Sequence, residues 1–219
     1  MSAPQILVLA KAPLPGRVKT RLCPPCTAEQ AARIAAAALA DTLATVTAST
    51  AGHRVLVIDG DHPAPPGWET LPQRGGPLGE RLTNAFADTR KSGTGTVLVG
   101  MDTPQLTTAH LAAAQTLLST PDGPDAVFGP AVDGGWWALG LRDPAHATVL
   151  RTIATSTATT GRLTLAALHG RGLRVGRLPR LRDVDTVADA RTVAGLCPPG
   201  SRFVHAVAAD VPSPATVGR

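Results

Sequence analysis

The chain opens with a short apolar run, residues 6–10, that passes directly into a loop containing Pro13, Pro15 and Gly16. The run is continuous rather than alternating, which is typical of a strand buried on both faces of a parallel sheet. The two prolines and the glycine end the strand and fix the loop that follows it. Ligands of open α/β sheets bind beyond the carboxyl ends of the strands. The sequence therefore predicts a binding loop at this edge of such a sheet.

Four cations stand in or beside that loop: Lys11, Arg17, Lys19 and Arg21. Basic residues in a loop are often only solvated surface. A solvated loop, however, needs neither two prolines nor four cations at a strand exit. We therefore interpret the loop, Gly16 included, as a site for the phosphate groups of a ligand.

Apolar runs alternate with helical stretches along the rest of the chain. This order favours a single α/β domain with a parallel or mixed sheet and helices on both faces. Strands are expected at residues 6–10, 54–58, 68–71, 96–100, 125–128, after the loop 129–140, and at 173–178. Helices are expected at residues 27–46, from about 82 to 90, and at 107–118, 145–151, 161–170 and 186–194. The folded domain is expected to span residues 1–196, and residues 197–219, which lack periodicity, to form a loosely attached tail.

Composition narrows the class of partner. A formal net charge of +5 permits an anionic ligand. No stripe of Lys and Arg interleaved with aromatic residues appears, so a nucleic-acid surface is disfavoured. No apolar stretch of about eighteen residues is present, so no membrane partner is expected. The pattern leaves the oligomeric state open.

The start of the chain lacks a basic region followed by an apolar one, so no secretory signal is expected. The three cysteines give no disulfide framework. Cys23 and Cys26 have CxxC spacing, but a second pair that could complete a zinc site is missing. Incidental thiols in a reducing compartment are the simplest interpretation, and we expect a cytoplasmic protein.

Asp102 follows the strand expected at residues 96–100 and is placed to emerge at the carboxyl edge of the sheet. Mg²⁺ prefers one or two carboxylates together with substrate phosphates, so Asp102 could hold such an ion. The alternative is the N-cap of a helix beginning near residue 105. Asp183 and Asp185 form a second carboxylate group, for which capping at Thr186 is again the alternative. Asp102 and Asp185 together predict a two-carboxylate site for Mg²⁺ or Mn²⁺.

Two glycine-containing segments are further candidates. Asp133 precedes Gly134 and Gly135, and it could orient an acceptor hydroxyl, act as a base, or simply hold a turn. Trp136 and Trp137 behind it could stack on a sugar or fill the core. Gly75 and Gly76 stand near a helix entry, which suits anions, and Arg81 one turn later could reach a phosphate.

These segments together resemble the DUF2064 family of GT-A-fold, glycosyltransferase-like proteins related to the phospholactate guanylyltransferases. The resemblance covers residues 5 to about 194, and the matching motifs are AKAPLPGRVKTRL (10–22), GGPLGERL (75–82), GMDTPQL (100–106), GPAVDGGWWALG (129–140) and DVDT (183–186). It implies a nucleotide-diphospho-sugar-transferase-like fold whose first loop surrounds the nucleotide.

By position, the resemblance makes Lys11, Arg17, Lys19 and Arg21 phosphate contacts, and Asp102 and Asp185 metal ligands. Residues 73–76, including Gln73, would line the base or ribose pocket. Lys19 and Asp133 are the candidate catalytic residues. The chain departs from many relatives at Trp136-Trp137, where Tyr-Tyr is common, and at Thr155, where Trp is common.

Three functions follow as hypotheses. The first is transfer of a sugar from a nucleotide-diphosphate sugar to a small acceptor. The second is nucleotidylyl transfer from a nucleoside triphosphate to a phosphorylated small molecule, with release of pyrophosphate. The third is nucleotide binding without catalysis. The resemblance slightly favours sugar transfer, whereas four cations in one loop suit a triphosphate somewhat better.

Overall fold

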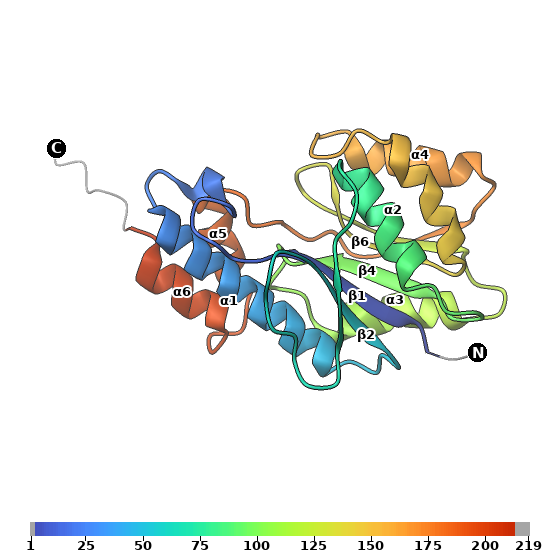
Figure 1. Cartoon of the computed structure of the whole chain (residues 1–219), viewed down its shortest axis with the longest axis horizontal. Helices are drawn as coiled ribbons and strands as arrows, with labels where there is room; N and C mark the ends of the chain where they lie inside the picture. Colours follow the sequence, from blue (N-terminus) through green and yellow to red (C-terminus); the bar gives the residue numbers. More distant parts are fainter. Residues whose placement is uncertain (1–2, 213–219) are drawn as a thin grey trace.

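A computed structural model describes residues 3–212, within which a seven-stranded sheet forms the centre of the molecule (Figure 1). Its strand order is β3-β2-β1-β4-β6-β5-β7. The strands are β1 (Gln5–Lys11), β2 (Arg54–Asp59), β3 (Glu69–Pro72), β4 (Thr96–Gly100), β5 (Ala126–Pro130), β6 (Trp136–Leu141) and β7 (Val175–Arg177). Within this sheet β6 pairs antiparallel with both of its neighbours, and the other pairings are parallel. The predicted mixed, mostly parallel sheet is confirmed.

Helices cover both faces of the sheet, as the alternating pattern predicts. On one face, α1 (Ala28–Thr47) and α3 (Thr108–Ser119) share a core cluster with one set of sheet side chains. On the other, α2 (Leu78–Asp88), the 3-10 segment η2 (Pro144–Thr152) and α4 (Thr160–Gly170) share a second cluster. The central strand β4 contributes side chains to both clusters, with Val97 and Val99 in the first and Leu98 in the second, because successive side chains of a strand point to opposite faces.

Local signals fix several boundaries. Thr27 begins α1 through a capping box in which its hydroxyl accepts from the Gln30 amide and the Gln30 side chain accepts from the Thr27 amide. The same device begins α3 at Thr107 and α5 (Val187–Ala194) at Thr186. A short 3-10 turn, η1 (Thr20–Leu22), ends the first loop.

Two details of the predicted elements change. The segment expected to be helical at residues 145–151 is a 3-10 helix that follows a cap at Asp143. The stretch 129–140, expected to be a loop leading into a strand, already belongs to the paired strands β5 and β6 at both of its ends. The register between these strands shifts at Gly129 and Pro130. This irregularity interrupts the alternation of side chains, as a β-bulge does.

The expected loose tail at residues 197–219 is wrong for the part that the structure describes. Residues 202–210 form α6 (Arg202–Asp210), which packs on the outer side of α1. Phe203 is fully buried, and Val207, one turn later, is buried on the same face. Arg33 on α1 donates to both carboxylate oxygens of Asp210. Residues 213–219 lie outside the described part of the chain.

The missed signal is a short one. Ser201 caps α6 by accepting from the Val204 amide, and Phe203 and Val207 are spaced by four. Two apolar positions do not establish periodicity by themselves. Their burial depends on α1, whose Ala31, Ile34 and Ala38 form the other side of a third cluster. No helix of the described residues is long and apolar enough to cross a membrane.

Replacement of Phe203 tests whether α6 is part of the fold. We expect Phe203→Ala to lower the free energy of unfolding by about 3–5 kcal/mol, because it leaves a cavity between α6 and α1. His205→Ala, on the exposed side of the same helix, is the control and should change it by less than about 0.5 kcal/mol. Urea denaturation followed by circular dichroism measures both. If Phe203→Ala changed the free energy of unfolding as little as His205→Ala, the packing of α6 on α1 would not contribute to stability.

Candidate functional site

The first loop turns back on itself where β1 ends. The amide of Arg17 donates to the carbonyl of Leu14, and Gly16 adopts a φ of +72°, which suits a residue without a side chain. Val18 and Leu22 are buried and anchor the loop to the core. Lys19 lies between them with a φ of +48°, in the left-handed region that non-glycine residues seldom occupy. Such local strain persists only where the surroundings impose it, and it often marks a functional residue.

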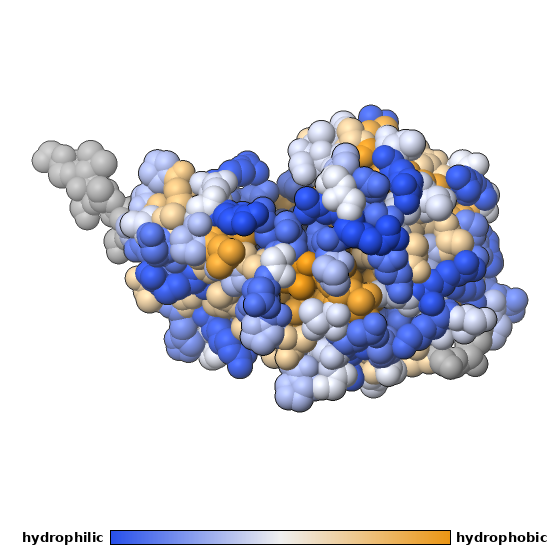
Figure 2. All heavy atoms as spheres, viewed as in Figure 1, coloured by the Kyte–Doolittle hydropathy of each residue, from blue (hydrophilic) through white to orange (hydrophobic). Residues whose placement is uncertain are grey.

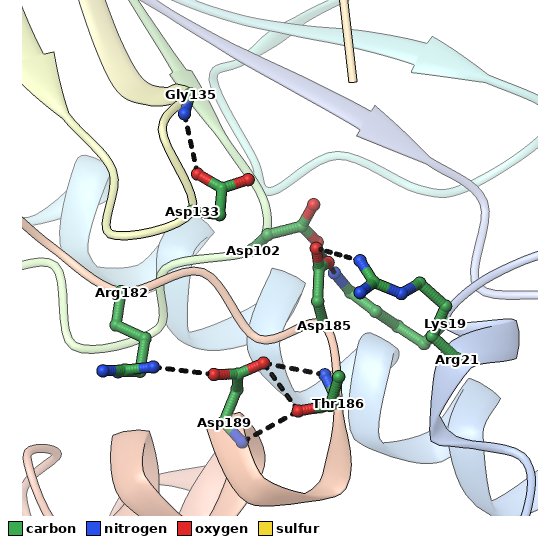
Figure 3. Close-up of polar contacts among 9 residues, drawn as sticks. All are labelled: Lys19, Arg21, Asp102, Asp133, Gly135, Arg182, Asp185, Thr186 and Asp189. Carbon is green, nitrogen blue, oxygen red and sulfur yellow. Dashed lines mark hydrogen bonds and ion pairs between the residues drawn. The ribbon is translucent and has the colours of Figure 1, made fainter. Parts of the chain in front are cut away.

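The surroundings of Lys19 are two aspartates from distant parts of the sequence (Figure 3). Its ammonium nitrogen lies 2.7 Å from Oδ1 of Asp102 and 3.3 Å from Oδ1 of Asp185. Burial alone would lower the pKa of this ammonium, but the two carboxylates outweigh burial and raise the pKa above its usual value. The Lys19 side chain is only 10% exposed, whereas those of Asp102 and Asp185 are 41% and 33% exposed, so the ammonium is desolvated and the carboxylates still face solvent.

A second loop cation joins the cluster at its exposed side. Arg21 Nη1 lies 3.0 Å from Oδ2 of Asp185, and the Arg21 side chain is 70% exposed. Asp102 comes from the exit of β4, whereas Asp185 lies just before α5. The cluster therefore ties the first loop, the central sheet and the carboxyl-terminal part of the chain together.

Neither aspartate caps a helix. The cap of α3 is Thr107, paired with His110, and the cap of α5 is Thr186, paired with Asp189. Asp189 is also the partner of Arg182, at 2.9 Å (Figure 3). The capping alternatives considered for Asp102 and Asp185 are therefore wrong, and both carboxylates remain available at the edge of the sheet.

A third carboxylate, Asp183, lies close to these two; the sequence analysis grouped it with Asp185 but did not predict it as a metal ligand. Its Oδ1 is buried, and within residues 3–212 it has no hydrogen-bond partner. Burial, together with the neighbouring carboxylates of Asp102 and Asp133, raises the pKa of Asp183 to about 8. Asp183 is thus protonated at neutral pH and holds an unused polar atom beside the cluster.

The donor set fits a hard divalent cation. Asp102 and Asp185 converge on a single positive charge, the Lys19 ammonium, and both offer the oxygen donors that Mg²⁺ prefers. The orphaned oxygen of Asp183 adds a further polar atom at the same place. Within residues 3–212, no three His, Cys, Asp or Glu side chains are arranged to hold a metal ion by themselves. The arrangement matches an ion that would also need phosphate oxygens of a ligand.

Two adjoining cavities open on either side of the ion cluster. The smaller, about 250 Å³, is lined by Lys11 and by the loop from Arg17 to Arg21. The larger, about 530 Å³, extends toward β6 and the segment before α4. The two share Arg21, Met101, Asp102 and Asp185. Seen from outside, the surface is hollowed between the part carrying α1, α5 and α6 and the part carrying α2 and α4 (Figure 2).

Asp133 lines the larger cavity and also holds the β5–β6 turn. Its Oδ1 accepts from the amide of Gly135 at 2.8 Å (Figure 3). Gly134 has a φ of +92°, and a Cβ there would lie 2.1 Å from the Ala158 carbonyl oxygen. The Gly161 amide donates to the Gly134 carbonyl at 2.8 Å. The paired glycines therefore let this turn dock against the start of α4, which fixes where Asp133 points.

The two neighbouring tryptophans have different surroundings. Trp137 is 2% exposed, belongs to the cluster under α1 and α3, and donates from Nε1 to the Pro179 carbonyl. Trp136 is half-buried and packs against the other cluster. The split follows from the alternation of side chains along β6, because successive residues of a strand point to opposite faces of the sheet. Trp137 is thus a core residue that reaches the cavity wall, and Trp136 is the more accessible of the two.

The predicted ligand contacts after β3 and at the start of α2 instead form hydrogen bonds and an ion pair with other residues of the protein. Gln73 Nε2 donates to the Ala10 carbonyl at 2.6 Å, and Arg81 Nη1 lies 2.9 Å from Asp59 Oδ2. The Gly76 amide, expected to face an anion, donates to the Glu80 carboxylate at 2.9 Å. None of Gln73, Gly75, Gly76 and Arg81 lines either of the two cavities. They hold the strand exits on which the first loop rests.

Residues before α4 form a wall of the larger cavity that the sequence analysis did not predict. Thr155, Ser156, Thr157 and Thr160, the last of which begins α4, contribute hydroxyl-bearing side chains, and Leu78 and Leu82 of α2 contribute apolar side chains to the same lining. Nothing in the local pattern of residues 155–160 marks them as a wall, because only the packing of α2 and η2 brings them there.

The fold and this site define a class, the nucleotide-diphospho-sugar-transferase-like α/β proteins. The chain belongs to the family DUF2064, described as an uncharacterized protein conserved in bacteria, whose pattern matches residues 30–157. The predicted family is thereby confirmed. No curated protein matches the chain in sequence.

Solved structures share the fold. A Desulfovibrio desulfuricans G20 protein, provisionally described as a nucleotide-diphospho-sugar transferase, is 28% identical with a TM-score of 0.84, and 95% of each chain is covered. A cytidylyltransferase from Leptospira borgpetersenii is 13% identical with a TM-score of 0.58, over 95% of this chain and 94% of the other. Rv0371c from Mycobacterium tuberculosis is 21% identical with a TM-score of 0.53, over 88% and 98%. The last two show likeness of fold alone.

The raised pKa of Asp183 makes stability depend on pH. In the unfolded chain this carboxyl has a pKa of about 3.9. Between that value and about 8, the folded protein holds a proton that the unfolded chain has lost, so the free energy of unfolding falls as pH rises through this range. Asp183→Asn removes the effect. We expect the variant to gain stability over the native chain more at pH 8 than at pH 5.

Urea denaturation at both pH values, in EDTA, measures this difference. Asp122→Asn, at an exposed position far from the cluster, is the control and should shift the two midpoints equally. A gain from Asp183→Asn that is the same at pH 5 and pH 8 would contradict a buried, protonated Asp183.

Proposed function

We propose that this protein is a transferase that moves a sugar from a nucleotide-diphosphate sugar to a small acceptor, with Mg²⁺ or Mn²⁺. One observation carries the proposal. Two cations of the first loop, Lys19 and Arg21, meet the carboxylates of Asp102 and Asp185 in a single cluster between two cavities, and Lys11 and Arg17 line the smaller of these cavities. Such an arrangement can hold the diphosphate of a nucleotide sugar in one cavity and the sugar that is transferred in the other.

Lys11, Arg17, Lys19 and Arg21 bind the diphosphate in the smaller cavity. As the bond between sugar and diphosphate breaks, negative charge grows on the leaving phosphate oxygens. Fixed cations in a partly desolvated site stabilise that charge in the transition state more than in the ground state. Of the two cations in the cluster, Lys19 is less exposed than Arg21, so its ammonium contributes more to the stabilisation of the leaving diphosphate.

Asp102 and Asp185 hold the divalent ion, and Asp183 lies beside them with its free oxygen. When bound, such an ion supplies Lewis-acid stabilisation of the leaving diphosphate. The Lys19 ammonium and the ion compete for the same two carboxylates, because both require them. If the ion took both carboxylates, the Lys19 ammonium would be free to contact the phosphates instead.

Asp133 faces the larger cavity from a turn that is held rigid by Gly134 and Gly161. Its Oδ1 is engaged by the Gly135 amide, which leaves Oδ2 to orient an acceptor hydroxyl or to take its proton. Gln73, Gly75, Gly76 and Arg81 act as supports of the strand exits that carry the nucleotide loop. We therefore assign these four residues a role in positioning the loop, in place of the direct contacts with base, ribose or phosphate that the sequence predicted.

Nucleotidylyl transfer is the second candidate, and the charge of the loop favours it. Four cations match a triphosphate, and a cytidylyltransferase shares the fold. The two reactions differ in what they release. The first frees a nucleoside diphosphate, and the second frees pyrophosphate.

A product assay separates the candidates. We incubate the protein with Mg²⁺ and panels of nucleotide sugars and nucleoside triphosphates, together with pooled small-molecule acceptors. Release of nucleoside diphosphate from a nucleotide sugar supports the proposal, and pyrophosphate from a triphosphate supports the second candidate. Nucleotide binding by thermal shift without either product would establish a binding module. Asp102→Ala should lower product release at least tenfold, whereas Asp122→Ala should leave it unchanged.

Competition between Lys19 and the metal gives a test that needs no substrate. Lys19→Met keeps the apolar stem and removes the ammonium, which leaves Asp102 without a cation partner and Asp185 with Arg21 alone. We expect Mn²⁺ to bind this variant at least tenfold more tightly than the native chain, measured by titration with electron paramagnetic resonance. Asp102→Ala should lose the binding. Weaker Mn²⁺ binding in Lys19→Met would contradict a metal site between the two carboxylates.

A further inference from the structure

The two cavities have opposite charge. The smaller one has Lys11, Arg17, Lys19 and Arg21 in its wall, against the two carboxylates of the cluster. The larger one has a single cation, Arg21, against the three charged carboxylates of Asp102, Asp133 and Asp185, and it also contains the protonated carboxyl of Asp183. Arg21 is already paired with Asp185 at 3.0 Å. Among the described residues, therefore, the larger cavity has no unpaired cation to offer a ligand.

From this charge difference we propose that the larger cavity takes an unphosphorylated hydroxylic group, neutral or cationic, such as a sugar ring or an amino sugar. This inference rests on the proposed transferase site and names the acceptor class of that site. It also means that the protein does not use a phosphorylated second substrate.

Electrostatics provide the first reason. A phosphate monoester carries a charge of about −1.5 to −2 at neutral pH. In the larger cavity it would face the carboxylate of Asp133, which has no cation partner among the described residues, and it would find no free guanidinium or ammonium to bind it, because Arg21 is paired with Asp185. Like charges held close in a desolvated site repel, and such repulsion is a common source of specificity. A hydroxyl or ammonium group meets no such opposition, because carboxylates accept hydrogen bonds from both.

The rest of the wall provides the second reason. Thr155 and Thr157 line the cavity, and their hydroxyls can exchange hydrogen bonds with a polyol, whereas the Thr160 hydroxyl already donates to the Ala154 carbonyl. Leu82 and the accessible Trp136 add apolar surface to the same lining. A sugar ring has the same division between polar edges and apolar faces. The volume of about 530 Å³ lies within the range of small-molecule sites.

Two of the three tryptophans line this cavity and can report on it. The third, Trp68, lies near the surface and donates to Thr47. We use Trp68→Phe as the background, so that fluorescence comes from Trp136 and Trp137. Inorganic pyrophosphate and Mg²⁺ are kept at saturation, so that the loop cations are occupied. The probes are matched pairs: glucose with glucose 6-phosphate, glucosamine with glucosamine 6-phosphate, and glycerol with glycerol 3-phosphate.

In each pair that binds, we expect the plain member to bind at least tenfold more tightly than the phosphorylated one. Thr155→Arg places a cation in the cavity wall and should improve binding of the phosphorylated members at least tenfold. Thr152→Arg, exposed and outside the cavity wall, is the matched control and should change nothing. Phosphorylated members that bind as tightly as the plain ones, or plain members that do not bind at all, overturn the inference.

The outcome is separable from that of the proposed function. A preference for plain probes, in a protein that releases no nucleoside diphosphate from any nucleotide sugar, keeps the assignment of the cavity and removes sugar transfer. Sugar transfer to a phosphorylated acceptor keeps the proposed function and removes the inference.

Discussion

The contact of Lys19 with Asp102 and Asp185 is the interaction on which the arrangement of this site depends. Two carboxylates from segments more than 80 residues apart repel each other at close range unless a cation lies between them. The loop supplies that cation at the expense of a left-handed backbone at Lys19. The same contact closes the first loop over the sheet edge and separates the two cavities.

The separation gives each side of the site its own chemistry. Cations on one side suit the phosphates of a nucleotide, and carboxylates with hydroxyls and an aromatic ring on the other suit an uncharged group. Two glycines support this division. Gly134 allows the Asp133 turn to meet α4, and Gly79 allows α2 to approach the Leu150 carbonyl, where a Cβ would lie 2.3 Å away. Both glycines thus allow the close packing of segments that line the larger cavity.

Much of the fold followed from the sequence because its signals are local. Buried strands such as β1 and β4 are continuous apolar runs, and Thr27, Thr107 and Thr186 begin helices by their own side chains. The carboxyl-terminal helix did not follow, since Phe203 and Val207 have meaning only against α1. Residues 73–81 were expected at the ligand for their glycines and arginine, but their partners, Asp59 and the Ala10 carbonyl, come from other strands.

The sequence by itself determined the class of fold, the family and the two ingredients of the site, a basic loop after β1 and aspartates after β4 and before α5. Strand exits of one sheet edge bring such residues together by topology alone. Only the tertiary structure decided how these charges are paired, that Asp183 is buried beside them, and that residues 155–160 wall a second cavity. Pairing and burial depend on distances between segments far apart in the chain, which no local pattern of residues contains.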